Sequence, residues 1–186
     1  MPLVISLFAL IIALNLLGRH WWCQCHSLVP WSFDIWSLHN SQHLVDWYSL
    51  THLLHGLLFY FLFWCFGRFA HKFTPNLPFS TKIGFTIALI IELVWEIAEN
   101  SPFIIERYRA ATMALNYYGD SILNSSFDLL ACALGYTLAA RTSTRLAVGL
   151  AIFIEIFLLA VIRDNLTLNI VMLLFPLEFI KAWQKP

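Results

Sequence analysis

The chain has 186 residues, of which 60% are hydrophobic and only 12% charged, and its mean hydropathy is +0.72. Soluble domains have about 25% charged residues, so this composition excludes an ordinary water-soluble fold and indicates that lipid covers most of the surface. The formal net charge of +0 excludes the basic surface that is typical of nucleic-acid-binding proteins. We therefore expect a single membrane domain over residues 1–186 whose partners are membrane lipids.

Apolar runs with polar connections predict an all-α, polytopic bundle of transmembrane helices with five to six spans. A span needs about 20 mainly apolar residues, because the hydrocarbon core is about 30 Å thick. The first run has the length of a signal-peptide core, but no cleavage site follows it, so we expect a retained helix. The predicted spans are residues 3–17, 50–69, 83–98, 121–140 and 146–162, with 166–176 as either a short sixth span or an interfacial helix.

The connection after the first run, residues 19–49, is the only long loop that the pattern predicts. Loops of this length are functional or disordered, and its density of Trp, His and Asn argues against disorder. It contains Cys23 and Cys25, the cysteines that do not lie in apolar runs. Their spacing differs from that of thioredoxin-like and zinc motifs, so a redox or metal role for this pair has little support from the sequence.

The distribution of Lys and Arg favours a cytoplasmic N-terminus, because positively charged loops resist translocation. In that orientation the cytoplasmic side receives Arg68, Lys72, Lys82, Arg141 and Arg145, and also Lys181 and Lys185 if the sixth stretch crosses. The opposite side receives Arg19, Arg107, Arg109 and Arg163. The long loop then lies outside.

Three predicted helices carry ionisable side chains within the hydrocarbon, where such residues are costly and usually functional. Steps of three and four residues return to the same face of a helix, so each group forms a stripe. The stripes are Asp46, His52 and His55 on the second helix, Glu92, Glu96 and Glu99 on the third, and Asp120, Asn124 and Asp128 on the fourth. Because neighbouring spans run in opposite directions, all three stripes reach the outer half of the bilayer and we expect them to form one site.

The residue types in this predicted site indicate three roles. Imidazole and carboxylate ligands suit zinc or a similar divalent cation, and we assign His52, His55 and Glu92 to such a metal. The candidate catalytic groups are Glu96, Glu99, Asp120 and Asp128. Guanidinium and polar groups nearby could hold a phosphate or other ligand, and these are Arg107, Arg109, Asn124, Asp164 and Asn165.

Structural explanations stay open for several of these residues. Glu106, Arg107 and Arg109 could form ion pairs without catalysis, and Asn124 could act as an interhelical hydrogen-bonding group. The two histidines could simply lie at the polar interface. Glu155, alone in the fifth span, has no assignment.

Several motifs resemble one family across nearly the whole chain. They are EIAENSPFIIERYR at 96–109, GDSILNS at 119–125, IRDNLTLN at 162–169, HNSQH at 39–43 and HLLHG at 52–56. This pattern resembles an uncharacterised bacterial family of multi-pass membrane proteins, UPF0314, which carries domain of unknown function 2585. The resemblance implies a protein of the bacterial inner membrane and names no reaction.

A fainter similarity is to the VanZ-like proteins, which are associated with the bacterial envelope and with glycopeptide tolerance. The order of their characteristic residues along the chain is similar to that of Asp46, His55, Glu96, Arg107, Asp120, Asn124 and Gly135. The chain departs from that order where Glu99 and Asn100 replace the usual glutamine.

Three classes of function fit this pattern. The first is a membrane-embedded enzyme, with a divalent metal as its cofactor, that acts on an envelope lipid or lipid-linked substrate. The second is a non-catalytic binder or carrier of a lipid, ion or proton, although the broken helices and internal repeats typical of carriers are missing from the sequence. The third is a membrane assembly factor whose protein partners the sequence does not identify.

Overall fold

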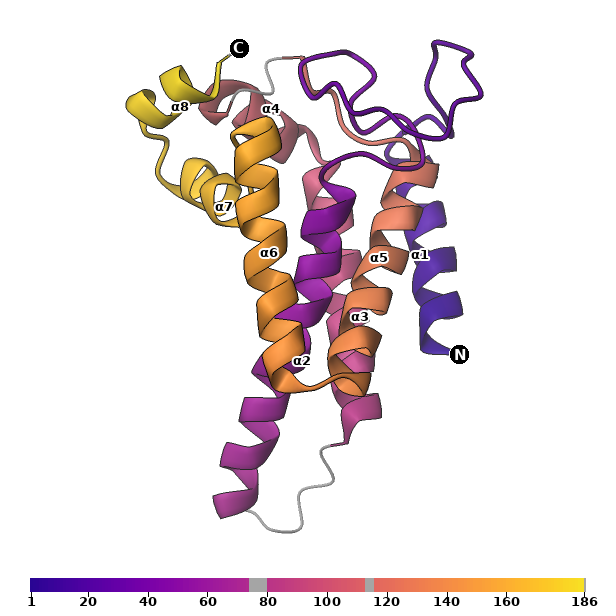
Figure 1. The fold of residues 1–186 in the computed structure, drawn as a ribbon. Coiled ribbons are helices and arrows are strands. Elements are labelled where there is room, and N and C mark those ends of the chain that lie inside the picture. Colours follow the sequence, from indigo (N-terminus) through magenta and orange to yellow (C-terminus); the bar gives the residue numbers. More distant parts are fainter. Residues whose placement is uncertain (74–79, 113–115, 186) are drawn as a thin grey trace.

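A computed structural model describes residues 1–73, 80–112 and 116–185, and within them the chain forms eight α-helices and no extended strand pair beyond an isolated bridge. Figure 1 shows an elongated bundle with short helices gathered at one end. The predicted all-α class is confirmed. The helices are α1 (Pro2–Leu16), α2 (Ser49–Phe73), α3 (Thr81–Glu99), α4 (Pro102–Ala111), α5 (Ile122–Arg141), α6 (Thr144–Ile162), α7 (Leu166–Leu174) and α8 (Glu178–Gln184).

Three of the described helices are long and apolar enough to cross a membrane, namely Ser49–Ala70 within α2, α5 and α6. This property indicates a membrane protein. Helix α1 is apolar but has only 15 residues, and α3 carries three glutamates in 19 residues. Helix α7 has nine residues and a length of about 14 Å at 1.5 Å per residue, so it is too short to be the sixth span.

Most helix starts follow from a local capping signal. A side-chain oxygen before the first turn accepts a hydrogen bond from a backbone N–H that has no partner within the helix. The capping residues are Ser80, Ser101, Ser121, Ser143 and Asn165, which precede α3 to α7 in that order. Helix α4, which was not predicted, has Pro102 in its first position, where the missing proline N–H has no consequence.

Helix α5 lies at the centre of the bundle, packed against α2. The two backbones approach closely because glycine faces each contact: a Cβ atom added to Gly56 would lie 2.0 Å from the Cys132 carbonyl oxygen. The same atom added to Gly135 would lie 2.0 Å from the Leu53 carbonyl oxygen. On one side, Leu10 and Leu14 of α1 join a core with α3 and α5. Small residues such as Gly56 and Gly135 characterise close helix contacts in membranes.

Helix α7 turns back beside the end of α6 (Figure 1). The Glu155 carboxylate of α6 accepts hydrogen bonds from the backbone N–H groups of Leu166 at 3.0 Å and Thr167 at 3.3 Å. A carboxylate at a helix N-terminus satisfies free donors and interacts favourably with the helix dipole. Glu155 therefore has a structural position, at the start of α7.

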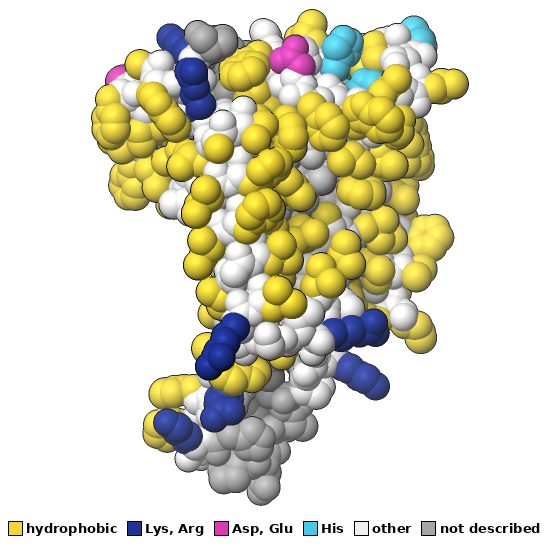
Figure 2. Space-filling view, in the orientation of Figure 1, with side chains coloured by type: hydrophobic (Ala, Val, Ile, Leu, Met, Phe, Trp, Pro, Cys, Tyr) yellow, Lys and Arg dark blue, Asp and Glu magenta, His cyan; other side chains and the backbone are white. Residues whose placement is uncertain are grey.

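The two ends of the bundle differ in charge. The loop end carries residues 18–48, α4, α7 and α8, and the basic end carries Arg68, Lys72, Lys82, Arg141 and Arg145. Hydrophobic side chains cover most of the face between them in Figure 2. Because α7 does not cross, α8 lies at the loop end, where Arg163 donates to the Lys185 carbonyl oxygen at 2.9 Å. Lys181 and Lys185 were placed beside the basic end only if residues 166–176 cross, and in the structure they lie at the loop end.

The long loop at the loop end is tied to the start of α5. The backbone N–H groups of Ser121 and Ile122 donate to the Ser41 and His20 carbonyl oxygens at 2.9 and 2.8 Å. The Gln42 side-chain amide also donates to the Gly119 carbonyl oxygen at 2.6 Å. These contacts hold the loop over the polar stripes of the helices beneath.

Candidate functional site

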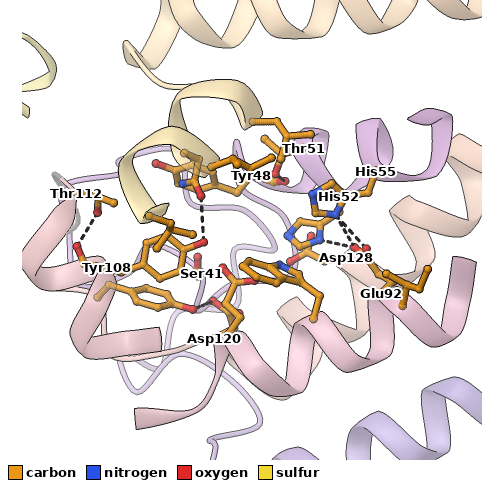
Figure 3. Close-up of a pocket in the computed structure, with 18 of the residues that line it drawn as sticks. Ser41, Tyr48, Thr51, His52, His55, Glu92, Tyr108, Thr112, Asp120 and Asp128 are labelled. Atoms are coloured by element: carbon orange, nitrogen blue, oxygen red, sulfur yellow. Dashed lines mark hydrogen bonds and ion pairs between the residues drawn. The ribbon is translucent and has the colours of Figure 1, made fainter. Parts of the chain in front are cut away.

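A cavity of about 330 Å³ lies beneath the loop end, bounded by α2, α3, α4, α5, α7 and the long loop. Figure 3 shows polar side chains from these elements converging on it. Its polar lining consists of Asn40, Ser41, Tyr48, Thr51, His52, His55, Glu92, Glu99, Tyr108, Thr112, Tyr117, Asp120, Asp128 and Asn169. Six of the predicted site residues are in this set.

Glu92 is the centre of the polar cluster. Its carboxylate lies 2.6 Å from Nδ1 of His52 and 3.0 Å from Nδ1 of His55, and Figure 3 shows both rings directed at it. Glu92 is 0% exposed and His52 only 6%. The two imidazoles share one face of α2 because their positions are three residues apart. The three predicted metal ligands therefore lie next to one another in the structure.

Several carboxylate oxygens around this centre have no hydrogen-bond donor among the described residues. Oε1 and Oε2 of Glu96, Oε2 of Glu99 and Oδ1 of Asp128 are all buried in this state. Oε1 of Glu96 lies 3.2 Å from Nδ1 of His52, but that nitrogen is closer to Glu92. Buried polar groups normally have partners, so these oxygens identify a place that attracts protons or cations.

Among the described residues, no Lys or Arg forms an ion pair with the carboxylates of this cluster. The ion pairs join His52 to Glu92 and Glu96, and His55 to Glu92. Since an uncompensated buried carboxylate is strongly unfavourable, the cluster requires either bound protons or a bound cation.

The donor atoms lie close enough together to share a metal ion. Those of His52, His55 and Glu92 lie within 4.8 Å of one another, and so do those of His52, Glu96 and Glu99. His52 belongs to both sets. Imidazole nitrogen and carboxylate oxygen are common ligands of zinc and similar cations.

Asp120 joins the end of α3 to the start of α5. The Asn100 side-chain amide donates to its Oδ2 at 3.1 Å, and the Tyr117 hydroxyl donates to its Oδ1 at 2.9 Å. Burial raises the pKa of Asp120 to about 6, although both donors favour the charged form. This carboxyl group can therefore gain or lose a proton near neutral pH.

The rest of the cavity wall is apolar. It consists of Leu58, Phe59, Ile91, Trp95, Leu166, Ile170 and Leu173. Leu58, Ile91 and Ile170 are between 39% and 47% exposed on the outside of the bundle, so this wall continues into the apolar surface of the helices. Sequence analysis missed these residues, because an aromatic or aliphatic residue facing a cavity has the same pattern as one facing lipid.

The chain matches a family model described as "Protein of unknown function (DUF2585)" over residues 14–186. It belongs to the DUF2585 family. Relatives of this DUF2585 member include UPF0314 proteins of Rhizobium meliloti, 46% identical over 91% of this chain and 82% of theirs, and of Brucella anthropi, 48% identical over 90% and 80%. One of Rhizobium etli is 49% identical over 96% of this chain and 87% of the relative.

The family match confirms the predicted resemblance to UPF0314 proteins. The similarity to VanZ-like proteins is not supported by these matches and stays a prediction. No solved structure matches this DUF2585 member.

The predicted ligand-binding residues of this DUF2585 member lie outside the cavity lining. Arg107 donates through Nε to the Leu173 carbonyl oxygen at 2.8 Å, and Arg109 donates to the Tyr117 carbonyl oxygen. Asn124 donates to the Asp46 carboxylate at 3.4 Å. Both guanidinium groups thus join elements at the loop end, and neither is placed to hold a ligand in the cavity.

Asp164 and Asn165, the other two predicted ligand-binding residues, connect α6, α7 and α8. The side chain of Asn165 caps α7. Asp164 accepts hydrogen bonds from the Tyr48 hydroxyl at 3.0 Å and the Gln184 side-chain amide at 3.1 Å. Burial raises the pKa of Asp164 to about 6.

We expect the raised pKa of Asp164 to make the stability of the fold depend on pH. Because the pKa of Asp164 is higher in the folded than in the unfolded state, the folded protein binds more protons between about pH 4 and 6, and its stability falls as pH rises through that window. The full effect is up to about 3 kcal/mol. Thermal denaturation between pH 4 and 7 measures this effect. As the pH rises, the stability of purified Asp164→Asn should fall less than that of the wild type. Equal declines in both proteins would contradict this account.

Proposed function

We propose that this DUF2585 family member is a multi-pass enzyme of the bacterial inner membrane that uses a divalent metal ion in its cavity to act on an envelope lipid or lipid-linked substrate. One observation carries the proposal: buried carboxylates with free oxygens face two histidines, and no Lys or Arg among the described residues is paired with them. A divalent cation would offset part of the negative charge of this cluster.

A metal ion held by His52, His55 and Glu92 gives the cavity a defined chemistry. Such an ion would supply Lewis-acid chemistry, which lowers the pKa of a bound water to about 7 and favours hydrolysis at neutral pH. Glu99 and Asp128 line the same cavity and can accept the proton of that water. The same carboxyl group would then donate that proton to the leaving oxygen of the substrate as its bond breaks.

The apolar wall supports a lipid as the substrate. Ligand cavities have volumes of about 300–1,000 Å³, and the present one, at about 330 Å³, suits a polar headgroup with the first part of an acyl chain. Leu58, Ile91 and Ile170 line it and are partly exposed on the surface of the bundle. A chain lying against them stays in contact with the hydrocarbon.

The charge at the two ends supports a cytoplasmic N-terminus. Segments 68–82 and 141–145 contain basic but no acidic residues, which is typical of cytoplasmic connections. At the loop end, cations such as Arg107, Arg109 and Lys181 are bonded to backbone carbonyl oxygens. The cavity then lies towards the outer leaflet.

Metal analysis of the purified protein tests the proposal. After chelation and reloading with zinc or manganese, we expect His52→Ala and Glu92→Gln each to lose one metal equivalent relative to the wild type. The exposed residues His20 and Glu106 provide matched controls, because His20→Ala and Glu106→Gln remove the same chemical groups outside the cavity. Lipids that copurify with the wild type, identified by mass spectrometry, should be depleted in the two cavity variants.

Equal metal content in all five proteins would refute the metalloenzyme. The same free carboxylates also suit a proton-coupled carrier, since intramembrane carboxylates form proton relays. In that case Asp128→Asn would alter uptake or proton coupling while the envelope lipids stay unchanged.

A further inference from the structure

A second group of metal-binding side chains lies in the long loop, outside the cavity lining. Cys23 and Cys25 follow α1, and His39 and His43 precede α2. Sγ of Cys23 lies 3.2 Å from Nδ1 of His39, and Sγ of Cys25 lies 3.6 Å from Nε2 of His43. All four ligand atoms lie within 4.8 Å of one another, and both cysteines are free thiols.

These separations are close to those of a tetrahedral site. Zinc binds sulfur at about 2.3 Å and imidazole nitrogen at about 2.0–2.1 Å, so its ligand atoms lie roughly 3.3–3.8 Å from one another. The two measured sulfur to nitrogen distances, 3.2 and 3.6 Å, are near or within this range. Two thiolates would also neutralise a divalent cation.

The ring of His43 is already oriented for binding. Its Nδ1 donates to the Val29 carbonyl oxygen at 2.5 Å, which leaves Nε2 without a proton and directed at Cys25. Histidines that bind metals usually donate their second ring nitrogen to a carbonyl or carboxylate in this way. The indole of Trp22 packs edge-on against the same ring, with centroids 5.3 Å apart. The site therefore has outer contacts as well as ligands.

We propose that the long loop holds a structural, zinc-like divalent cation through four side chains: Cys23, Cys25, His39 and His43. Four protein ligands leave no open position for substrate, which is typical of structural sites. Asn40 and Ser41 line the cavity and lie in sequence between the two histidines. The ion thus joins the two arms of the loop and fixes the segment that closes the cavity.

Cobalt substitution separates this site from the one in the cavity. The full chain, purified in detergent with a reductant and stripped of metal, is titrated with Co²⁺ and then with Zn²⁺. We expect a thiolate-to-cobalt charge-transfer band in the wild type, in His52→Ala and in the control Cys65→Ser. Cys23→Ser should lose the band, one zinc equivalent, and affinity by at least about 10–100-fold, the size of effect that outer-shell partners alone can have.

Cys23 is buried, so Cys25→Ser, at an exposed position, provides a second variant that does not disturb packing. The proposal is overturned if the wild type shows no thiolate band, if both serine variants keep it, or if mass spectrometry finds a Cys23–Cys25 disulfide in the reduced preparation. Loss of metal in His52→Ala alone would bear only on the cavity. The two metal sites therefore succeed or fail separately.

Discussion

Replacing Gly56 with alanine should leave little folded protein, because the added methyl group collides with backbone and not with a movable side chain. Its position is 2.0 Å from the Cys132 carbonyl oxygen and 2.6 Å from the Tyr136 backbone nitrogen. Helices α2 and α5 would have to move apart, which we expect to destabilise the fold by about 3 kcal/mol. The same displacement would draw His52 and His55 away from Glu92.

Gly149→Ala is the matched control, since a Cβ atom there has open space within 4 Å. In the interior of α6 this change should be neutral or stabilise the protein by about 0.5–1 kcal/mol, because alanine is the better helix former. Size-exclusion profiles and thermal denaturation in detergent measure the contrast. Similar behaviour of the two alanine variants would show that α2 and α5 do not approach this closely.

Glu92→Ala should give the second large effect, a loss of about 3–5 kcal/mol, because breaking a buried ion pair leaves its partner uncompensated, and His55 has no other ion-pair partner among the described residues. Glu92 is the only hydrogen-bond partner that the described contacts give to Nδ1 of both His52 and His55. Glu92→Gln keeps the shape and can accept from one ring and donate to the other. We therefore expect it to fold, with a loss near 1–2 kcal/mol, but not to bind the cavity metal.

Comparing these two variants separates the packing of Glu92 from its charge. Thermal denaturation gives the stability of each protein, and elemental analysis gives the bound metal. If Glu92→Gln bound as much metal as the wild type, the carboxylate would not be a ligand. If Glu92→Ala were as stable as the wild type, the histidines would have other partners.

Much of the helical framework could be predicted from the sequence. Each of the five long apolar runs became a helix, and the boundaries differ by only a few residues, as for 83–98 and Thr81–Glu99. Long apolar runs are decided by local composition and by the need to satisfy the backbone in lipid. Helix α4 was missed as a continuous element, although Ser101 and Pro102 are a standard helix start. Periodicity alone does not reveal so short and polar a helix.

The site was predictable only where helix geometry determines it. His52, His55, Glu92 and Glu96 meet because each occupies one face of a helix and adjacent helices are antiparallel. Arg107 and Arg109 were assigned to a ligand, but Arg107 bonds to α7 and Arg109 to Tyr117 in the segment after α4, and no sequence pattern specifies these contacts. The contact of Cys23 with His39 depends on the path of an irregular loop. Only tertiary structure brings such residues together.

The apolar wall of the cavity has a consequence for how any occupant must be measured. An amphiphile that reaches Leu58 and Ile91 from the hydrocarbon partitions between two non-aqueous phases, so its concentration in water does not set occupancy. Occupancy instead follows the mole fraction of that amphiphile among the surrounding lipids. Diluting such an amphiphile with inert detergent at constant bulk concentration would therefore lower its occupancy of the cavity. Binding curves for this protein should be plotted against the mole fraction of the amphiphile in the lipid or detergent phase.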